Sequence, residues 1–182
     1  MNNTNKKKVL SSIPTTEFRN KPSNLPVNKP NNKNVVFSFQ NFKCISIKNK
    51  EFNNHFKSIY EYAEWSLKLI NRISKFSTMK VPELLRISHK GPRCHQVTGK
   101  RLTKLKSILS SINVELNEQL EDCDYYELSL GQAEGRIFGY FIDNIYYIVL
   151  FDPHHLIYEQ LEYGSQQDLL YRNFNPWKVI SS

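Results

Sequence analysis

The feature that most constrains the fold is a set of three short apolar segments in the last third of the chain. Each is rich in aromatic and β-branched residues, which is typical of strands. Gly131 and Gly135 bracket the connection between the first and second segments. Asp143-Asn144 forms a two-residue connection between the second and third segments and tolerates a positive φ. The pattern predicts an antiparallel meander that ends at Asp152-Pro153, since proline cannot donate to a ladder. The three predicted strands are Tyr125–Leu130, Arg136–Ile142 and Ile145–Phe151.

The residues before the meander change from a strand pattern to a helical pattern. Residues 35–47 alternate well enough for a strand or a short hairpin. Apolar residues then recur at three- and four-residue steps after a candidate cap at Asn53-Asn54. They predict a helix that runs to about Phe76 and buries one face. That predicted face comprises Phe56, Ile59, Tyr60, Ala63, Leu67, Ile70 and Ile73.

Two further helices are predicted before the meander. Pro82 suits the first turn of a short helix. Leu102, Leu105 and Ile108 predict a longer helix whose polar side carries basic residues. We therefore expect an α+β domain over residues 35–182: an N-terminal strand, two to three helices, and then an antiparallel three- to four-stranded sheet. The helices are expected on one face of that sheet.

Charge is distributed unevenly along the chain. The net charge of +8 divides into +6 over residues 1–34, +11 over 35–106 and −9 over 107–182. A basic surface attracts polyanions such as nucleic acids without sequence specificity. The alternative is that the basic and acidic halves pair with each other in the fold. Residues 1–34, rich in Asn, Lys and Pro, predict a disordered basic tail, either a solvated extension or an arm that binds nucleic acid or a partner.

Several classes of protein and site are excluded by what the sequence lacks. No apolar run approaches the ~18–20 residues that span a bilayer, and no signal-peptide pattern is present. The three cysteines are widely spaced and form no disulfide framework. CxxC, HExxH and phosphate-binding glycine motifs are lacking, so we predict neither a metal nor a cofactor. The expectation is a cytoplasmic protein with no membrane contact.

The residues that could carry chemistry lie at the start of one predicted strand and after another. Arg136 opens the middle strand of the meander, while His154, His155 and Tyr158 follow its last strand. This stretch, together with the order of strand, helices and meander, resembles the RelE/ParE superfamily of small bacterial toxins. Many of those toxins are messenger-RNA endoribonucleases, either free or dependent on the ribosome. The resemblance implies a toxin-like RNA-binding protein or metal-independent endoribonuclease of a toxin–antitoxin, phage or mobile-element system.

The resemblance also implies roles for these residues. Cleavage would move the 2′-hydroxyl of RNA onto the adjacent phosphorus, which requires a base, an acid and cationic donors to the phosphoryl oxygens. Arg136 would clamp the phosphate. His154 or His155 would be the general acid or base, and Tyr158 would stack on a base or donate a proton. Candidate nucleic-acid contacts are Lys90, Arg93, His95, Lys100, Arg101 and Lys104.

Each assignment has a structural alternative. Arg136 could pair with Glu127 on the neighbouring strand, the two histidines could form a surface turn, and Tyr158 could pack at a sheet edge. The whole chain could be a non-catalytic protein-interaction or regulatory module, such as an antitoxin-like protein. RNA or the ribosome, and an antitoxin or another protein, are therefore the candidate partners. The catalytic interpretation requires Arg136, His154 or His155, and Tyr158 to meet in one solvent-accessible concavity with at least one of Lys90, Arg93 and His95.

Overall fold

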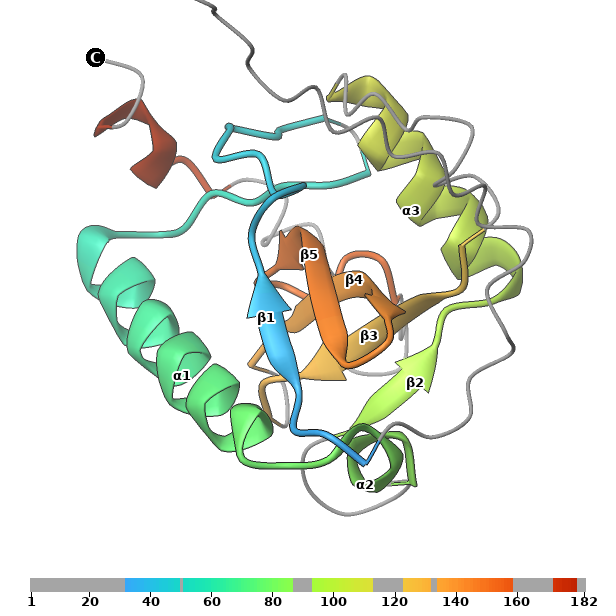
Figure 1. The fold of residues 1–182 in the computed structure, drawn as a ribbon. Helices are drawn as coiled ribbons and strands as arrows, with labels where there is room; N and C mark the ends of the chain where they lie inside the picture. The colour runs from blue at the N-terminus through green and yellow to red at the C-terminus, as the bar shows by residue number, and fades with distance from the viewer. Residues whose placement is uncertain are drawn as a thin grey trace, which may run out of the picture.

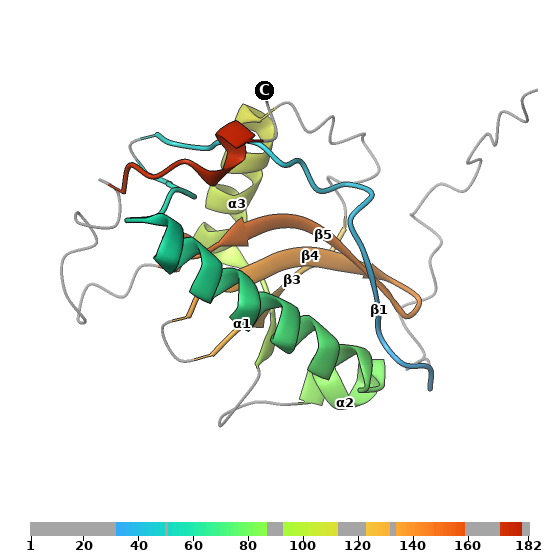
Figure 2. The ribbon, with the colours of Figure 1, turned by 90° about the vertical axis from the view of Figure 1, so that its left-hand side faces the viewer.

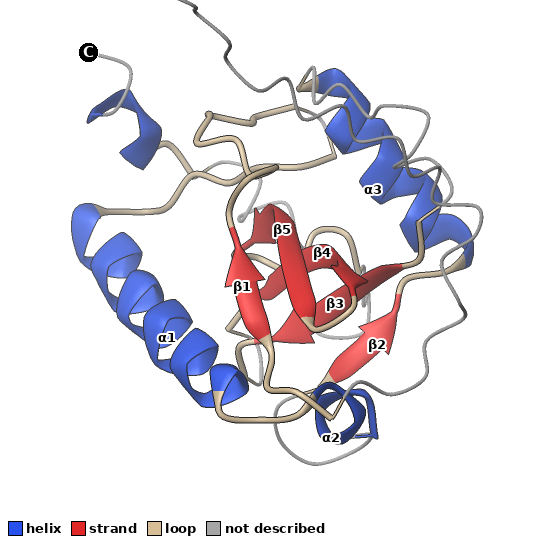
Figure 3. Cartoon of the chain, viewed as in Figure 1, coloured by secondary structure: helices blue, strands red, loops and turns tan. Residues whose placement is uncertain are grey.

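The computed structural model confirms the α+β class, with the N-terminal strand, the three helices and the meander in the predicted order and one further strand between the second and third helices (Figures 1 and 3). It describes residues 32–49, 51–86, 93–112, 123–131, 134–158 and 172–179, so nearly all of the predicted tail lies outside the described residues. The helices are α1 (Ile59–Ser77), α2 (Val81–Arg86) and α3 (Gly99–Ser111), and a 3-10 helix covers Pro176–Val179. The strands are β1 (Val36–Ser38), β2 (Cys94–Gln96), β3 (Tyr125–Ser129), β4 (Arg136–Ile142) and β5 (Ile145–Asp152).

The five strands form one mixed sheet in the order β1-β5-β4-β3-β2. The meander β3-β4-β5 is antiparallel as predicted, and Asp143 takes a φ of 54° in its two-residue turn. β2 pairs with β3 in antiparallel fashion, whereas β1 pairs with β5 in parallel. These two edge strands enlarge the predicted sheet. β1 (three residues) lies within the strand predicted over residues 35–47, whereas β2 was not predicted, because a run of three residues carries no period that a sequence pattern can reveal.

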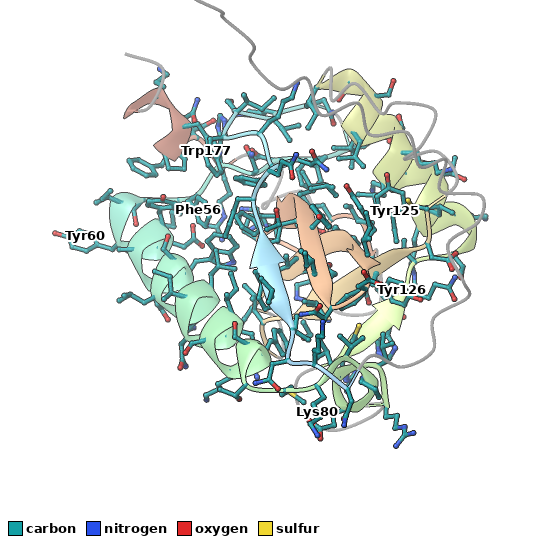
Figure 4. The ribbon with its side chains drawn as sticks, viewed as in Figure 1. Phe56, Tyr60, Lys80, Tyr125, Tyr126 and Trp177 are labelled. Carbon is teal, nitrogen blue, oxygen red and sulfur yellow. The ribbon has the colours of Figure 1, made fainter. Side chains whose placement is uncertain are left out.

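Helices cover both faces of the sheet, and not one face as predicted (Figure 2). α1 and α2 pack against Ile137 and its neighbours on one face, and α3 packs against Phe138 on the other. Successive residues of a strand point to opposite faces, and β4 and β5 bury apolar side chains on both. Tyr125 and Tyr126, which Figure 4 labels, likewise contribute to different cores. Both faces therefore need a covering layer.

α1 begins at a different residue and buries a different face from those predicted. Ser58 is its N-cap and accepts a hydrogen bond from the backbone N–H of Glu61 (3.3 Å). Asn53 and Asn54 instead make hydrogen bonds within the preceding loop. The residues that α1 buries are Trp65, Leu69 and Phe76. The residues of the predicted face that are exposed are Ile59, Tyr60, Ala63, Leu67 and Ile70. The helix carries two apolar stripes, and periodicity alone cannot tell which one faces the sheet.

A β-bulge lies where β4 pairs with β5. The register shifts between Phe138 and Gly139. A Cβ added at Gly139 would collide with the carbonyl oxygen of Tyr147 and would lie 2.8 Å from the ring of Tyr146. The close approach of β5 therefore requires glycine at this position, as expected for a glycine inside a strand.

Candidate functional site

A row of polar side chains crosses one end of the sheet. Arg136 is opposite Asp152 of β5 on one side and opposite Ser129 of β3 on the other. The backbone N–H of Ser129 donates to the carbonyl oxygen of Arg93, just before β2 (2.8 Å). Residues opposite each other in an antiparallel ladder share a face of the sheet. These four residues therefore lie in one row on the same face.

A second row on this face places Glu127 beside His95. The two residues are opposite each other in the ladder of β2 and β3, and Glu127 is two residues from Ser129, on the same side of β3. Phe138, which is opposite Glu127 on β4, belongs to the core that α3 covers. Both rows are therefore on the α3 face, where the charge of Arg101 in the first turn of α3 acts on Glu127.

Arg136 and His155 are joined by a direct hydrogen bond. Arg136 Nη1 donates to His155 Nε2 (3.0 Å) and to the carbonyl oxygen of Gly135 (2.9 Å). The backbone N–H of Gly135 donates to the same His155 Nε2 (3.0 Å). A ring nitrogen that accepts hydrogen bonds carries no proton, so His155 is neutral with its proton on Nδ1. Burial, and then the charge of Arg136, lower the pKa of His155 to about 4.

Arg101 and Tyr158 stack beside this pair. The Arg101 guanidinium lies 3.4 Å from the centre of the Tyr158 ring, a cation–π contact that joins α3 to the segment after β5. Burial lowers the pKa of Arg136, while the charges of Glu127 and, more weakly, Tyr158 raise it, so these groups act on one another. We call this group the arginine cluster; its members are Arg93, Arg101, Glu127, Arg136, His155 and Tyr158.

Glu127 is a buried carboxylate with one unpartnered oxygen. Glu127 is 5% exposed, and its Oε2 accepts no hydrogen bond from the described residues. Among the described residues no ion pair joins it to Arg136, whose Nη1 donates to His155 and to backbone carbonyls. Burial raises the pKa of Glu127, and the charges of Arg136 and Arg101 oppose that rise. The structure thus differs from the alternative in which Arg136 forms a salt bridge with Glu127.

His154 points away from the arginine cluster. Its Nε2 donates to the carbonyl oxygen of His55, and its ring centre lies 5.5 Å from that of Phe56, a residue of the core on the α1 face. Burial lowers the pKa of His154. Its contacts anchor the turn after β5 to the loop before α1. Of the four residues predicted to be catalytic, the structure brings three together: Arg136, His155 and Tyr158.

Asp152 holds the turn that separates the two histidines. Its carboxylate is fully buried and accepts three backbone N–H groups, from His154 (3.2 Å) and Leu156 (3.0 Å) on Oδ1 and from Ile157 (2.9 Å) on Oδ2. His155 lies within this turn with a φ of 59°. Burial raises the pKa of Asp152, and the N–H groups act in the opposite direction. The turn directs His155 toward the arginine cluster.

Three of the six predicted nucleic-acid residues lie in or beside the arginine cluster: Arg93, His95 and Arg101. Lys100 is exposed in the first turn of α3, Lys104 is half-buried one turn later, and Lys90 lies outside the described residues. The sequence analysis considers Glu127 only as a salt-bridge partner of Arg136. Its position inside an otherwise apolar strand could have identified it as a candidate site residue, because ionisable residues are rarely buried without a reason.

Metal-binding clusters and membrane spans are absent from the part of the chain that the structure describes. There, no three His, Cys, Asp or Glu side chains are placed to hold a metal ion. Within the same ranges no helix combines the length and the apolar character needed to cross a membrane. Cys94 is a buried free thiol whose pKa burial and Glu127 raise to about 12, so it is unreactive at neutral pH.

Comparison with known proteins places the chain in a family. No curated protein matches it, and no solved structure does. A family model described as Uncharacterised protein UU032 matches residues 38–182, which are 145 of the 182 residues. The match begins at the last residue of β1 and includes every member of the arginine cluster. The chain therefore belongs to the Uncharacterised protein UU032 family.

Proposed function

We propose that the arginine cluster binds the phosphate backbone of RNA, in a toxin-like RNA-binding protein or endoribonuclease. The observation that carries the proposal is the gathering of three arginines on one sheet face: Arg93, Arg101 and Arg136. A guanidinium presents planar, paired donors that match phosphate oxygens. Tyr158 adds an aromatic ring of the kind on which bases stack. The resemblance to RelE/ParE toxins rests on the stretch that contains Arg136, His155 and Tyr158.

His155 supports this site by orienting Arg136. Among the described residues, every hydrogen bond from the Arg136 side chain is made by Nη1. Nη2 and Nε remain to form a two-pronged contact with a phosphate. A histidine whose pKa is about 4 is neutral at pH 7 and is a poor proton donor there. We therefore assign His155 a positioning role.

Cleavage at this site would be a transphosphorylation. The 2′-oxygen forms a bond to phosphorus while the bond from phosphorus to the 5′-oxygen breaks, which yields a 2′,3′-cyclic phosphate and a 5′-hydroxyl. Glu127 is the proposed base for the 2′-hydroxyl proton, because its Oε2 has no hydrogen-bond partner among the described residues; that atom is buried, so this step requires the cluster to open when RNA binds. Tyr158 or water returns a proton to the 5′-oxygen. Arg136 and Arg101 stabilise the negative charge that develops on the phosphoryl oxygens.

Arg136→Ala is expected to weaken binding to a single-stranded RNA oligonucleotide by about 10- to 100-fold, because a charge-assisted contact is lost. The slope of log affinity against log salt concentration should also decrease in magnitude by about 0.7. Fluorescence anisotropy titrations at several salt concentrations measure both quantities. Arg136→Lys keeps the charge without the planar fork and should recover only part of the affinity.

Lys75→Ala is the matched control. It removes one positive charge from an exposed position on α1, on the opposite side of the sheet, and should leave the affinity within about twofold of wild type. Thermal unfolding verifies that each variant is folded. Arg101→Ala tests whether the arginine that α3 contributes to the arginine cluster also takes part in RNA binding. The proposal fails if wild-type protein does not bind RNA. It also fails if Lys75→Ala loses as much affinity as Arg136→Ala.

Glu127→Gln is expected to bind RNA as wild type does but to cleave it at least about 100-fold more slowly, because a general base is lost. End-labelled RNA, incubated alone and with ribosomes, measures the rate, and analysis of the product ends detects the 2′,3′-cyclic phosphate. Glu83→Gln, at an exposed position on α2, is the control and should cleave normally. Intact RNA in every wild-type reaction would contradict the proposed cleavage step. The proposal that the cluster binds RNA would then still be tested by the affinity measurements.

A further inference from the structure

Ser46 and His55 form a direct hydrogen bond outside the arginine cluster, in the loop between β1 and α1. Ser46 Oγ lies 2.7 Å from His55 Nε2. Ser46 is exposed, whereas only 7% of His55 is exposed. A hydroxyl nucleophile and its general base lie about 2.6–3.2 Å apart. The pair therefore meets the first geometric requirement for nucleophilic catalysis.

Two buried asparagines fix the loop that carries this pair. The Asn54 amide accepts from the backbone N–H of the residue after Ser46 and donates to the carbonyl oxygen of the residue before it (2.9 Å each). Asn53 Oδ1 accepts from the backbone N–H of His55 (2.9 Å). The carbonyl oxygen of His55 in turn accepts from His154 Nε2. The backbone is thus held on both sides of the pair, which gives the nucleophile and the base the fixed geometry that catalysis requires.

The surroundings of His55 are positively charged. Burial, and then the charges of Lys48 and Lys178, lower the pKa of His55. Lys178 follows Trp177, whose side chain belongs to the same core as that of Phe56, the residue after His55 (Figure 4). The imidazole is therefore neutral at pH 7 and can take a proton. The two lysines are placed to offset negative charge that develops beside it.

The second ring nitrogen of His55 has no hydrogen-bond partner among the described residues, although Nδ1 is buried. When Nε2 accepts from the Ser46 hydroxyl, the ring proton is on Nδ1. Buried polar groups nearly always have partners, and catalytic groups are among the exceptions. In a catalytic triad a carboxylate accepts from this nitrogen and stabilises the protonated ring. Ser46 and His55 therefore form a dyad, and we expect it to react more slowly than a triad.

We propose that Ser46 is a nucleophile with His55 as its general base, and that the pair cleaves activated esters whose acyl group carries a negative charge. Ser46 Oγ forms a bond to the acyl carbon, and the bond from that carbon to the ester oxygen breaks. The Ser46 proton passes through His55 Nε2 to the leaving oxygen. Water then attacks the acyl carbon, the bond to Oγ breaks, and Ser46 and a carboxylic acid are released. Lys48 and Lys178 favour the anionic acyl group and the developing oxyanion.

This activity does not depend on the proposed binding of RNA. Neither Ser46 nor His55 belongs to the arginine cluster, and His154, which contacts the His55 carbonyl, points away from that cluster. Ser46→Ala should therefore leave the affinity for RNA unchanged. Ester cleavage and RNA affinity are measured in separate experiments, so either proposal can fail while the other stands.

A fluorophosphonate tests the nucleophile, because Oγ forms a stable bond to phosphorus as fluoride leaves. Mass spectrometry of the treated full chain and of its peptides should find one adduct, on Ser46. His55→Gln keeps a polar side chain but no base and should be labelled at least about 100-fold more slowly. Ser74→Ala, which removes an exposed serine from α1, is the matched control and should be labelled as wild type is. Unmodified Ser46 in the wild-type protein would overturn the proposal, as would equal rates in wild type and a folded His55→Gln.

A pair of esters tests the preference for an anionic acyl group. Release of p-nitrophenol from p-nitrophenyl p-sulfobenzoate should be about 10-fold faster than from the uncharged p-nitrophenyl benzoate. Lys48→Ala should reduce this preference, whereas Lys75→Ala, at an exposed position on α1, should preserve it. Ser46→Ala should abolish the release of p-nitrophenol above the rate in buffer. Equal rates with the two esters would contradict the assigned substrate class, and the melting temperature of each variant separates loss of reaction from loss of folding.

Discussion

Asp152→Ala is expected to lower the free energy of unfolding by about 4 kcal/mol or more, the largest loss of any single change discussed for this chain. The Asp152 carboxylate is fully buried and accepts the backbone N–H groups of His154, Leu156 and Ile157. Removing it leaves three buried donors unsatisfied, each of which costs roughly 1–3 kcal/mol. The turn that directs His155 toward the arginine cluster should loosen as well.

Urea denaturation followed by circular dichroism measures the loss at Asp152. Asp152→Asn should be intermediate, because its amide oxygen still accepts while its NH₂ group cannot. Asp124→Ala is the control: Asp124 is exposed and accepts one hydrogen bond from Gln96 Nε2 (2.9 Å). Its substitution should cost less than about 1 kcal/mol. Equal losses at Asp124 and Asp152 would show that the buried carboxylate does not secure the turn.

The titration of His155 is expected to remove up to about 3 kcal/mol of stability as the pH falls from 6.5 to about 4. The folded state lowers the pKa of His155 below its ordinary value, so between these two pH values the unfolded chain binds more protons. The stability contributed by neutral His155 is therefore fully present above pH 6.5 and is lost as the pH falls through this window. A protonated ring could no longer accept from Arg136 and Gly135.

His155→Asn isolates this contribution. Asparagine tolerates the φ of 59° at this position and provides an amide oxygen as an acceptor, but it does not titrate. Burial also lowers the pKa values of His55 and His154, so the wild-type slope contains their contributions. The difference in unfolding free energy between wild type and variant, measured from pH 4 to pH 7, should therefore follow His155 alone. A difference that is independent of pH would contradict the assigned neutral state.

The meander was predictable because its strands carry their own signals. Asp143-Asn144 marks the hairpin turn, and Pro153 follows the end of β5. The predicted bounds agree with β3, β4 and β5 to within one residue. The edge strands were not recognised as partners of the sheet, because their pairings join distant parts of the chain. A local pattern cannot report a partner that lies so far away.

The buried face of α1 shows where periodicity fails. Both of its stripes satisfy helical spacing, and five of the residues predicted to be buried are exposed: Ile59, Tyr60, Ala63, Leu67 and Ile70. Contacts outside the helix decide between them: the Trp65 ring packs against those of Phe56 and Phe151, at 5.5 Å from each. The contact with Phe151 joins residues that are 86 positions apart. A sequence pattern can therefore predict that a helix forms without predicting which of its faces is buried.

In the candidate site, too, a local sequence pattern could not predict which side chains contact one another. The resemblance to RelE/ParE toxins predicted Arg136, His154, His155 and Tyr158 as a group. Which histidine reaches Arg136 depends on the φ of His155 and on the buried carboxylate that holds the turn, and neither follows from residue type. The contribution of α3 through Arg101 depends on helices covering both faces of the sheet.

The parallel pairing of β1 with β5 sets an order of events during synthesis. Val36 and its partner Ile145 are 109 positions apart, and chains are made at only about 5–20 residues per second. β1 therefore leaves the ribosome seconds before the strand that it will pair with exists. Until β5 has been synthesised, β1 has no strand with which to form backbone hydrogen bonds. The sheet can therefore be completed only when β5 is complete. A chain interrupted before β5 would expose the type of strand edge through which proteins aggregate.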